Sequence, residues 1–367
     1  MRHISRVIRC GVRAGAISLF VLICAATVRS APCIAVAPEC TEWISVAGQQ
    51  GRLLVYRSYP LDSRNDGITR AFILIHGGTR DADNSYRSAL AAGFLADALG
   101  DTVIISPRFA SGEGSRDGRD CKDPMAAGEI SWVCDLKNPD SWRSGGPAIG
   151  NDKLTSFDLM DEILRKLARK AVFPNLKAIV LAGHSAGGQF VTRYQMANQL
   201  HETLGVAISY IVSNASGAYL DPLRPTPAAY PVNASAPGYI APPPASAFAP
   251  FADARNCANY NNWPYGLNHR TGYAARLSDD QLKKQIASRP AIYLMGEYDV
   301  LPLAGFDASC PAMAQGPTRL ARGLAYQKYL NENYGAHHKA VVVPVCGHNV
   351  RCMFTADVTL PLAFPKP

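Results

Sequence analysis

The amino-acid sequence predicts an α/β fold, in which a doubly wound, mostly parallel sheet is flanked by helices. Two observations predict this fold. Short apolar runs alternate along the chain with segments of helical pattern, which is typical of parallel strands that are joined by helices. A Gly-x-Ser-x-Gly pentapeptide also spans residues 183–187, directly after one apolar run and before a helical pattern, as expected where a strand turns sharply into a helix.

The predicted sheet opens with an antiparallel hairpin, because two β-rich runs at residues 43–46 and 52–59 flank a glycine-bracketed turn at 48–51. Six nearly continuous apolar runs follow, and they fit strands that are buried on both faces of a parallel sheet. These runs span residues 70–76, 102–107, 177–185, 206–213, 290–295 and 339–345. Helical patterns span residues 86–99, 154–170, 188–204, 279–288 and 322–334.

Two long connections interrupt this alternation, at residues 110–152 and 219–268. Loops of this length in a compact domain are usually functional or disordered. Both follow the carboxyl ends of strands, where open α/β sheets bind ligands, so we expect them to form the walls of a cleft. We interpret residues 219–275 as a loop-rich lid or cap insertion; a flexible insert without contacts is the alternative for residues 222–250. The aromatic residues expected to bind substrate are Trp132, Tyr219 and Trp263.

The N-terminal residues 1–30 have the pattern of a cleavable signal peptide. Arginines precede an apolar run at residues 14–28, and the small residues Ser30 and Ala31 follow it. The run is shorter than the roughly 20 residues that span a bilayer, so we expect no stable membrane anchor. The remaining residues 31–367 are predicted to form a single domain, and the protein is predicted to be secreted or periplasmic.

The formal net charge of +8 overstates how basic the mature protein is, because five of the arginines lie within the predicted signal peptide. No cluster of lysines and arginines interleaved with aromatic residues occurs elsewhere in the sequence. We therefore expect no nucleic-acid partner.

Eight cysteines follow the predicted signal peptide, and an even set in an exported protein predicts disulfide bonds. Many pairings are open on sequence alone, but pairing between sequence neighbours closes the shortest loops. It would join Cys33 with Cys40, Cys121 with Cys134 and Cys346 with Cys352, and leave Cys257 and Cys310 to pair by default. Zinc is the competing explanation, yet no Cys-x-x-Cys occurs, so we expect no metal and no cofactor.

Ser185, at the centre of the pentapeptide, is the predicted nucleophile. A strand that reverses into a helix within a few residues forces its central residue toward positive φ, and only small neighbours such as Gly183 and Gly187 leave room for that turn. The helix that follows also directs its unpaired N–H groups toward the same place.

A serine hydroxyl needs a base, and the base needs an orienting carboxylate. His348 and Asp299 each follow a predicted buried strand, so both are expected at the sheet edge at which Ser185 emerges. Asp307 is the alternative acid. An oxyanion would be met by the backbone N–H groups of Gly78 and Ala186, with Thr79 as the alternate donor.

These motifs, in the chain order His76-Gly77-Gly78, Ser185, Asp299 and His348, resemble the α/β-hydrolase superfamily. The resemblance covers nearly the whole mature chain. It implies the α/β-hydrolase fold and a Ser-His-Asp catalytic triad. The secreted, disulfide-bearing form looks similar to the extracellular serine esterases, such as feruloyl and acetylxylan esterases and polyhydroxyalkanoate depolymerases.

The expected function is hydrolysis of a small or polymeric carboxylic ester through an acyl-enzyme intermediate. A peptidase, an amidase or an acyltransferase would use the same three residues, so these activities remain alternatives. A hydrolase-fold protein that binds a ligand without catalysis is the alternative from another class, and the presence of all three residue types argues against it.

Overall fold

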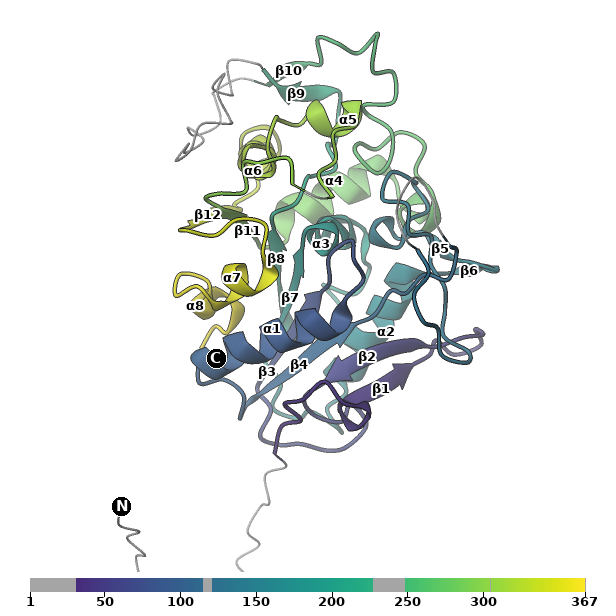
Figure 1. Cartoon of the computed structure of the whole chain (residues 1–367), viewed down its shortest axis with the longest axis vertical. Coiled ribbons are helices and arrows are strands. Elements are labelled where there is room, and N and C mark those ends of the chain that lie inside the picture. The colour runs from purple at the N-terminus through teal and green to yellow at the C-terminus, as the bar shows by residue number, and fades with distance from the viewer. Residues whose placement is uncertain (1–30, 115–120, 227–247, 304, 367) are drawn as a thin grey trace, which may run out of the picture.

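The computed structural model describes residues 31–114, 121–226, 248–303 and 305–366, so the predicted signal peptide lies outside the described residues. The described residues form one eight-stranded sheet and two two-stranded sheets (Figure 1). The strand order in the large sheet is β1-β2-β4-β3-β7-β8-β11-β12. The β1–β2 and β2–β4 pairs are antiparallel, and the other five pairs of this sheet are parallel. The predicted fold class is confirmed.

The strands of the large sheet lie close to the apolar runs of the sequence. They are β1 (Thr41–Ile44), β2 (Leu53–Arg57), β3 (Arg70–Ile75), β4 (Thr102–Pro107), β7 (Ala178–His184), β8 (Ala207–Ser213), β11 (Ala291–Gly296) and β12 (Lys339–Val343). β1 and β2 form the expected hairpin. The runs end at the strand ends because charged or turn-forming residues flank them.

Two hydrophobic cores lie on opposite faces of the sheet, and β3 contributes to both because successive side chains of a strand point to opposite faces. Ala71, Ile73 and Ile75 belong to one core, and Phe72 and Leu74 to the other. A strand that is apolar at every position is therefore the product of burial on both faces.

Helices cover both faces of the sheet (Figure 1). α1 (Ala82–Leu95), α7 (Val350–Thr355) and α8 (Leu360–Ala363) pack on the core that contains Phe72. The core on the other face is covered by α2 (Ser156–Ala168), α3 (Ala186–Ala197), α4 (Asp279–Ser288) and α6 (Arg319–Tyr334). The short helices are η1 (Pro38–Cys40), η2 (Trp142–Ser144), η4 (Gly272–Arg276) and α5 (Cys310–Met313).

Several helix bounds differ from the prediction. α1 begins and ends four residues before the pattern at 86–99, and α6 begins three residues before the pattern at 322–334. The first two residues of the helical pattern at 154–170 belong to β6 (Asn151–Thr155), and the helix starts only after Thr155, whose side chain forms a capping box with Asp158. The pattern at 188–204 ends early, because Asn198 has extended backbone and its side-chain amide donates to the Tyr194 carbonyl oxygen.

The two long connections contain short ordered elements. β5 (Pro147–Ala148) pairs with β6 at the end of the first connection. β9 (Leu223–Pro225) pairs with β10 (Phe248–Pro250) in the second, of which residues 227–247 lie outside the described part. In both connections, aromatic side chains pack into the core instead of facing an open cleft.

Four disulfide bonds join the cysteines as neighbour pairing predicts. They link Cys33 with Cys40, Cys121 with Cys134, Cys257 with Cys310 and Cys346 with Cys352. Disulfide bonds are typical of extracellular and periplasmic proteins. Among the residues that the structure describes, no cluster of His, Cys, Asp and Glu is arranged to hold a metal ion.

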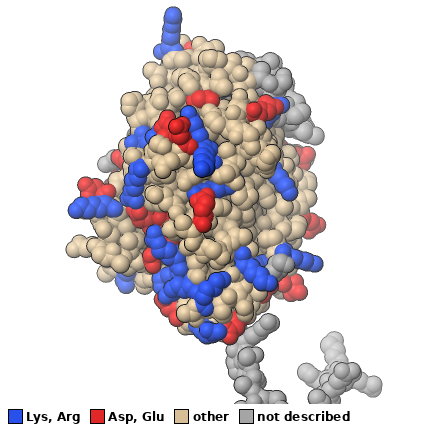
Figure 2. All heavy atoms as spheres, turned by 180° about the vertical axis from the view of Figure 1, so that it is seen from behind, with Lys and Arg blue, Asp and Glu red and all other residues tan. Residues whose placement is uncertain are grey.

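Within the described ranges, no helix is both long and apolar enough to cross a membrane. On the face that Figure 2 shows, basic and acidic side chains lie among one another, and most of the surface is uncharged.

His76, directly after β3, ties the ends of two strands together. Its Nε2 accepts the backbone N–H of Phe109 at 3.0 Å, so the ring proton is on Nδ1, which donates to the Gly77 carbonyl oxygen at 2.9 Å. Burial lowers the pKa of His76 from 6.5 to about 4. The ring is therefore neutral and acts as a brace for the loop after β3.

The packing of Phe72 predicts the effect of its truncation. Phe72 is fully buried and contacts the rings of Phe354 and Phe364, which anchor α7 and the C-terminal segment to the sheet. We expect Phe72→Ala to lower the free energy of unfolding by about 3–5 kcal/mol, measured by urea denaturation. Phe94→Ala is the matched control, because the Phe94 side chain is exposed and should cost less than about 0.5 kcal/mol. Equal losses in both variants would contradict the packing argument.

The low pKa of His76 predicts acid sensitivity. The unfolded chain binds a proton at His76 below about pH 6.5, whereas the folded chain does so only near pH 4, so acid favours unfolding. Between pH 7 and pH 4.5, this residue should lower the free energy of unfolding by roughly 2 kcal/mol. His76→Gln should flatten the measured pH dependence by that amount, and the exposed His337→Gln should not. Identical profiles for all three proteins would refute this assignment.

Candidate active site

Ser185 occupies a tight turn between β7 and α3, with φ 58° and ψ −117°. The two flanking glycines are required by close backbone contacts. A Cβ atom on Gly183 would lie 2.2 Å from the Gly187 carbonyl oxygen, and one on Gly187 would lie 2.3 Å from the Ile75 carbonyl oxygen. The Ser185 side chain is half-buried at the tip of this turn.

A chain of hydrogen bonds connects Ser185, His348 and Asp299. The His348 Nδ1 donates to Asp299 Oδ2 at 2.7 Å, and the Ser185 hydroxyl lies 2.9 Å from His348 Nε2, which is then free to accept its proton. Asp299 follows β11 and His348 follows β12, so the structure brings the three residues to one sheet edge as the sequence predicts. Asp299 is 2% exposed, and its Oδ1 lies 3.4 Å from Arg319 Nη1.

Asp307 has other partners. Its Oδ2 accepts the Tyr265 hydroxyl at 2.5 Å, and its Oδ1 accepts the backbone N–H of Ser309 at 2.9 Å. The structure does not bring it into hydrogen-bond contact with His348, whereas Asp299 makes that contact.

Asn214 links the two loops that carry His348 and Asp299, a role that the sequence analysis missed. Its Oδ1 accepts the backbone N–H of Gly296 at 2.7 Å, and its Nδ2 donates to the Gly347 carbonyl oxygen at 3.1 Å. Asn214 itself has a φ of 49°, directly after β8. An Asn at the carboxyl end of a buried strand is a usable signal, because Asn tolerates positive φ better than most residues.

His184 packs against His348. The two rings are 4.7 Å apart between centroids, and His184 Nδ1 lies 3.3 Å from the Ser213 hydroxyl. Burial, assisted by the neighbouring His348, lowers the pKa of His184 well below its usual value. His184 is therefore a neutral wall for the His348 ring.

The loop after β3 presents the expected oxyanion donors beside Ser185. The Gly77 carbonyl oxygen accepts from His76 Nδ1 and from the Arg80 backbone N–H. These two hydrogen bonds fix the orientation of the Gly77 carbonyl group. Because the peptide unit is planar and trans, the Gly78 N–H points in the direction opposite to that carbonyl group. Ala186 is the first residue of α3, so its backbone N–H is one of the four that begin the helix. The Thr79 hydroxyl donates to Asp81.

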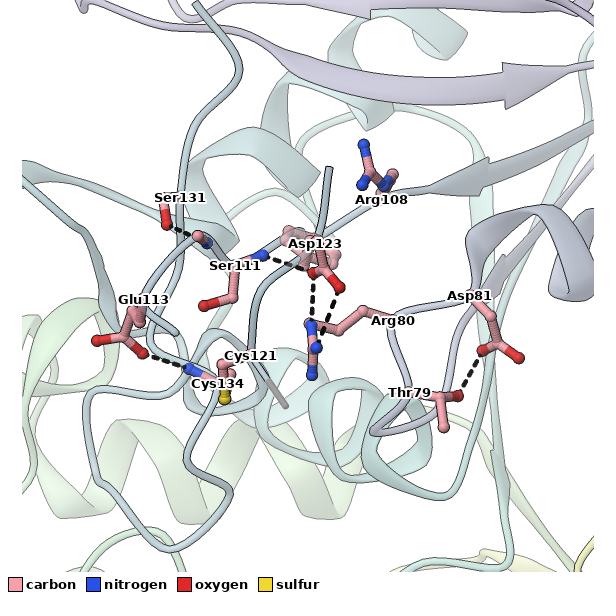
Figure 3. Close-up of polar contacts among 12 residues, drawn as sticks. Thr79, Arg80, Asp81, Arg108, Ser111, Glu113, Cys121, Asp123, Ser131 and Cys134 are labelled. Atoms are coloured by element: carbon pink, nitrogen blue, oxygen red, sulfur yellow. Dashed lines mark hydrogen bonds and ion pairs between the residues drawn. A yellow bond between two sulfur atoms is a disulfide. The ribbon is translucent and has the colours of Figure 1, made fainter. Parts of the chain in front are cut away.

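Arg80 fastens this loop to the first long connection. Its guanidinium pairs with both carboxylate oxygens of Asp123, at 2.6 and 3.1 Å (Figure 3). It also donates to the Gly78 carbonyl oxygen at 3.0 Å. Asp123 also accepts the backbone N–H of Ser111 at 2.7 Å. The orientation of the Gly78–Thr79 peptide is thus set by a salt bridge that the sequence motif did not reveal.

Ser185 lies between two cavities. The large cavity, of about 620 Å³, is lined among others by Gly78, Thr79 and His348. The small cavity, of about 30 Å³, is lined among others by Ala186 and Arg143. Ser185 borders both.

The three aromatic residues expected to bind substrate line neither cavity. Trp132 and Tyr219 are fully buried and Trp263 is 3% exposed, and all three belong to the core between the sheet and its helices. A role in substrate binding is therefore not supported by their positions. Their side chains stabilise the two long connections by packing.

Comparisons with known proteins agree with this architecture. No curated protein sequence matches the chain significantly. A structure of poly(aspartic acid) hydrolase-1 from Sphingomonas sp. KT-1 is similar, with 20% identity and a TM-score of 0.52, over 85% of this chain and 95% of that one. A poly(3-hydroxybutyrate) depolymerase from Bordetella parapertussis has 19% identity and a TM-score of 0.53, over 86% of this chain and 85% of that one. At this level of identity, both similarities support the fold.

The family model of the alpha/beta hydrolase family matches residues 72–359, which is more than half of the chain and includes every residue of the candidate site. With a parallel sheet, a strand-turn-helix at Ser185 and the chain order Ser, Asp, His, this protein belongs to the alpha/beta hydrolase family.

Proposed function

We propose that the protein is a serine hydrolase that cleaves carboxylic esters through an acyl-enzyme intermediate. The observation that carries the proposal is the hydrogen-bond chain from Ser185 through His348 to Asp299, at the border of two cavities. Ser185 is the nucleophile, His348 the general base and Asp299 the residue that orients the imidazole and stabilises its charged form.

The reaction follows from the positions of these groups. The Ser185 oxygen attacks the ester carbonyl carbon while His348 Nε2 takes the hydroxyl proton. The backbone N–H groups of Gly78 and Ala186 stabilise the oxyanion, with Thr79 as the alternate donor. His348 then protonates the leaving alcohol, and water releases the acid in a second, equivalent cycle.

The location and the domain organisation are part of this proposal. The four disulfide bonds support a secreted or periplasmic protein, because such bonds persist in oxidising compartments. We propose that residues 1–30 are a signal peptide, that residues 31–367 form one domain, and that residues 219–275 include a lid or cap over a small or polymeric ester substrate.

The deciding experiment compares the purified oxidised protein with Ser185→Ala on p-nitrophenyl esters of increasing acyl length. We expect the substitution to lower kcat/KM by about 10⁴-fold or more, because it removes the nucleophile. A fluorophosphonate probe should label the native protein at Ser185. Ser63→Ala, at an exposed serine outside both cavities, is the matched control and should keep native activity.

The outcomes separate the candidate functions. Turnover of anilides at rates comparable with esters would favour an amidase or peptidase, and diversion of the acyl group to an added alcohol would favour an acyltransferase. Absence of both turnover and labelling in folded protein would overturn the proposal in favour of a binding protein.

The disulfide between Cys346 and Cys352 brackets His348 and predicts a second effect. Replacement of both cysteines by serine should leave the sheet folded but let the His348 loop move. A misplacement of about 1 Å can cost on the order of 100-fold in rate, so we expect kcat/KM to fall by about 10- to 100-fold.

The control for this variant is Cys33→Ser with Cys40→Ser, which removes a disulfide at the start of the described chain and outside both cavities. It should retain native kcat/KM. Far-ultraviolet circular dichroism checks that both variants are folded. Native activity in the Cys346→Ser, Cys352→Ser variant would contradict a positioning role for this disulfide.

A further inference from the structure

The small cavity beside Ser185 has the size of one small polar group. Its volume of about 30 Å³ holds roughly two water-sized atoms, since one needs about 10–15 Å³ by the same measure. A carboxylate has two oxygen atoms and fits this space, whereas a long alkyl chain does not.

The lining of this cavity is cationic. Four of its residues, Lys137, Arg143, Arg319 and Arg322, carry positive charge, against one acid, Asp307. Arg319 faces Asp299, at 3.4 Å, and both carboxylate oxygens of Asp307 already accept hydrogen bonds from the protein. Counted with Asp307 and with Asp299 beside Arg319, the four cations of the lining still outnumber the carboxylates, so the cavity favours an anionic ligand.

In this lining, Arg143 has two buried side-chain donors without a partner, whereas Arg319 has one. Arg143 is 1% exposed, and its Nε and Nη2 atoms have no hydrogen-bond partner among the described residues. A buried guanidinium without an acceptor is costly, because the desolvation of the charge is not offset. Arg143 lies in η2, where its own carbonyl oxygen accepts from Arg193 Nη1 at 3.4 Å, so its backbone is held in place while Nε and Nη2 of its side chain lack an acceptor.

The position of His348 assigns the two cavities to the two halves of an ester. His348 must protonate the leaving alcohol, and it lines the large cavity but not the small one. The alcohol half therefore lies in the large cavity. The acyl half extends from Ser185 to the other side, past Ala186 and toward Arg143.

We propose that the small cavity binds a free carboxylate at the far end of the acyl group, with Arg143 as its principal partner and Lys137 at the cavity wall. The preferred substrates are then monoesters of short dicarboxylic acids. Guanidinium and carboxylate match in planar, two-point geometry, which gives such a contact both strength and direction. This inference rests on the proposed function, because it requires an acyl group on Ser185.

The test compares monoethyl succinate with ethyl levulinate, a neutral ester of nearly the same shape, in a pH-stat at neutral pH. The measured quantity is the ratio of the two kcat/KM values. A hydrogen bond to a charged group is worth about 10- to 100-fold, so the native ratio should exceed about 10 in favour of monoethyl succinate.

Variants of Arg143 assign the preference to this residue. Arg143→Gln should bring the ratio close to 1, and Arg143→Lys, which keeps the charge, should retain an intermediate ratio. Arg64→Gln is the matched control, because Arg64 is an exposed arginine that lines neither cavity, and its ratio should equal the native one.

Binding to the Ser185→Ala variant gives a readout without turnover or any change at Arg143. Titration calorimetry should find monoethyl succinate bound at least about 10-fold more tightly than ethyl levulinate.

The failure of this inference differs from the failure of the proposed function. A native ratio near 1, unchanged by Arg143→Gln, with both esters hydrolysed through Ser185, would overturn the carboxylate site and leave a serine esterase in which Arg143 only balances Asp307. Absence of any Ser185-dependent hydrolysis or labelling would overturn the esterase itself.

Discussion

The close approach of three backbone segments around Ser185 is the constraint on which the candidate site depends. The turn after β7 brings Gly183 against Gly187, and Gly187 in turn lies against the end of β3 at Ile75. A side chain at either glycine would push these segments apart. Because these segments stay in contact, the start of α3 and the loop after β3 both face the Ser185 hydroxyl. The expected oxyanion donors, Gly78 and Ala186, therefore come from two different elements that are held at a fixed spacing.

The remaining groups are held by ties between neighbouring strand ends. β8 lies between β7 and β11 in the sheet, so Asn214 at its end can reach the loops that carry Asp299 and His348. On the opposite side of Ser185, the Arg80–Asp123 salt bridge ties the loop after β3 to the first long connection. Hydrogen bonds and salt bridges of this kind fix the positions of loop residues that are not held by packing in a hydrophobic core.

The sequence predicted those parts of the molecule in which local pattern and burial agree. β4 and α4 were predicted at their observed bounds, because one is apolar throughout and the other has a Ser278 capping box at its start. The candidate triad was found because its residues follow strands. Asn214 was not found, because its hydrogen bonds reach Gly296 and Gly347, far away in the chain. Arg143 was not found, because the sequence does not show that its side chain is buried. The burial of Trp132, Tyr219 and Trp263 in the core was not predicted, since composition does not distinguish a loop that packs inward from one that lines a cleft.

The burial of Asn214 has a consequence for how the protein can be produced. Asn214-Ala215-Ser216 is an acceptor sequence for N-linked glycans, which eukaryotic secretory cells attach to chains before they fold. In the folded protein Asn214 is 1% exposed, and its amide nitrogen donates to Gly347. A glycan on that nitrogen would keep the loops of Asp299 and His348 apart. A bacterial host, or Ser216→Ala in a eukaryotic one, avoids this conflict between modification and folding.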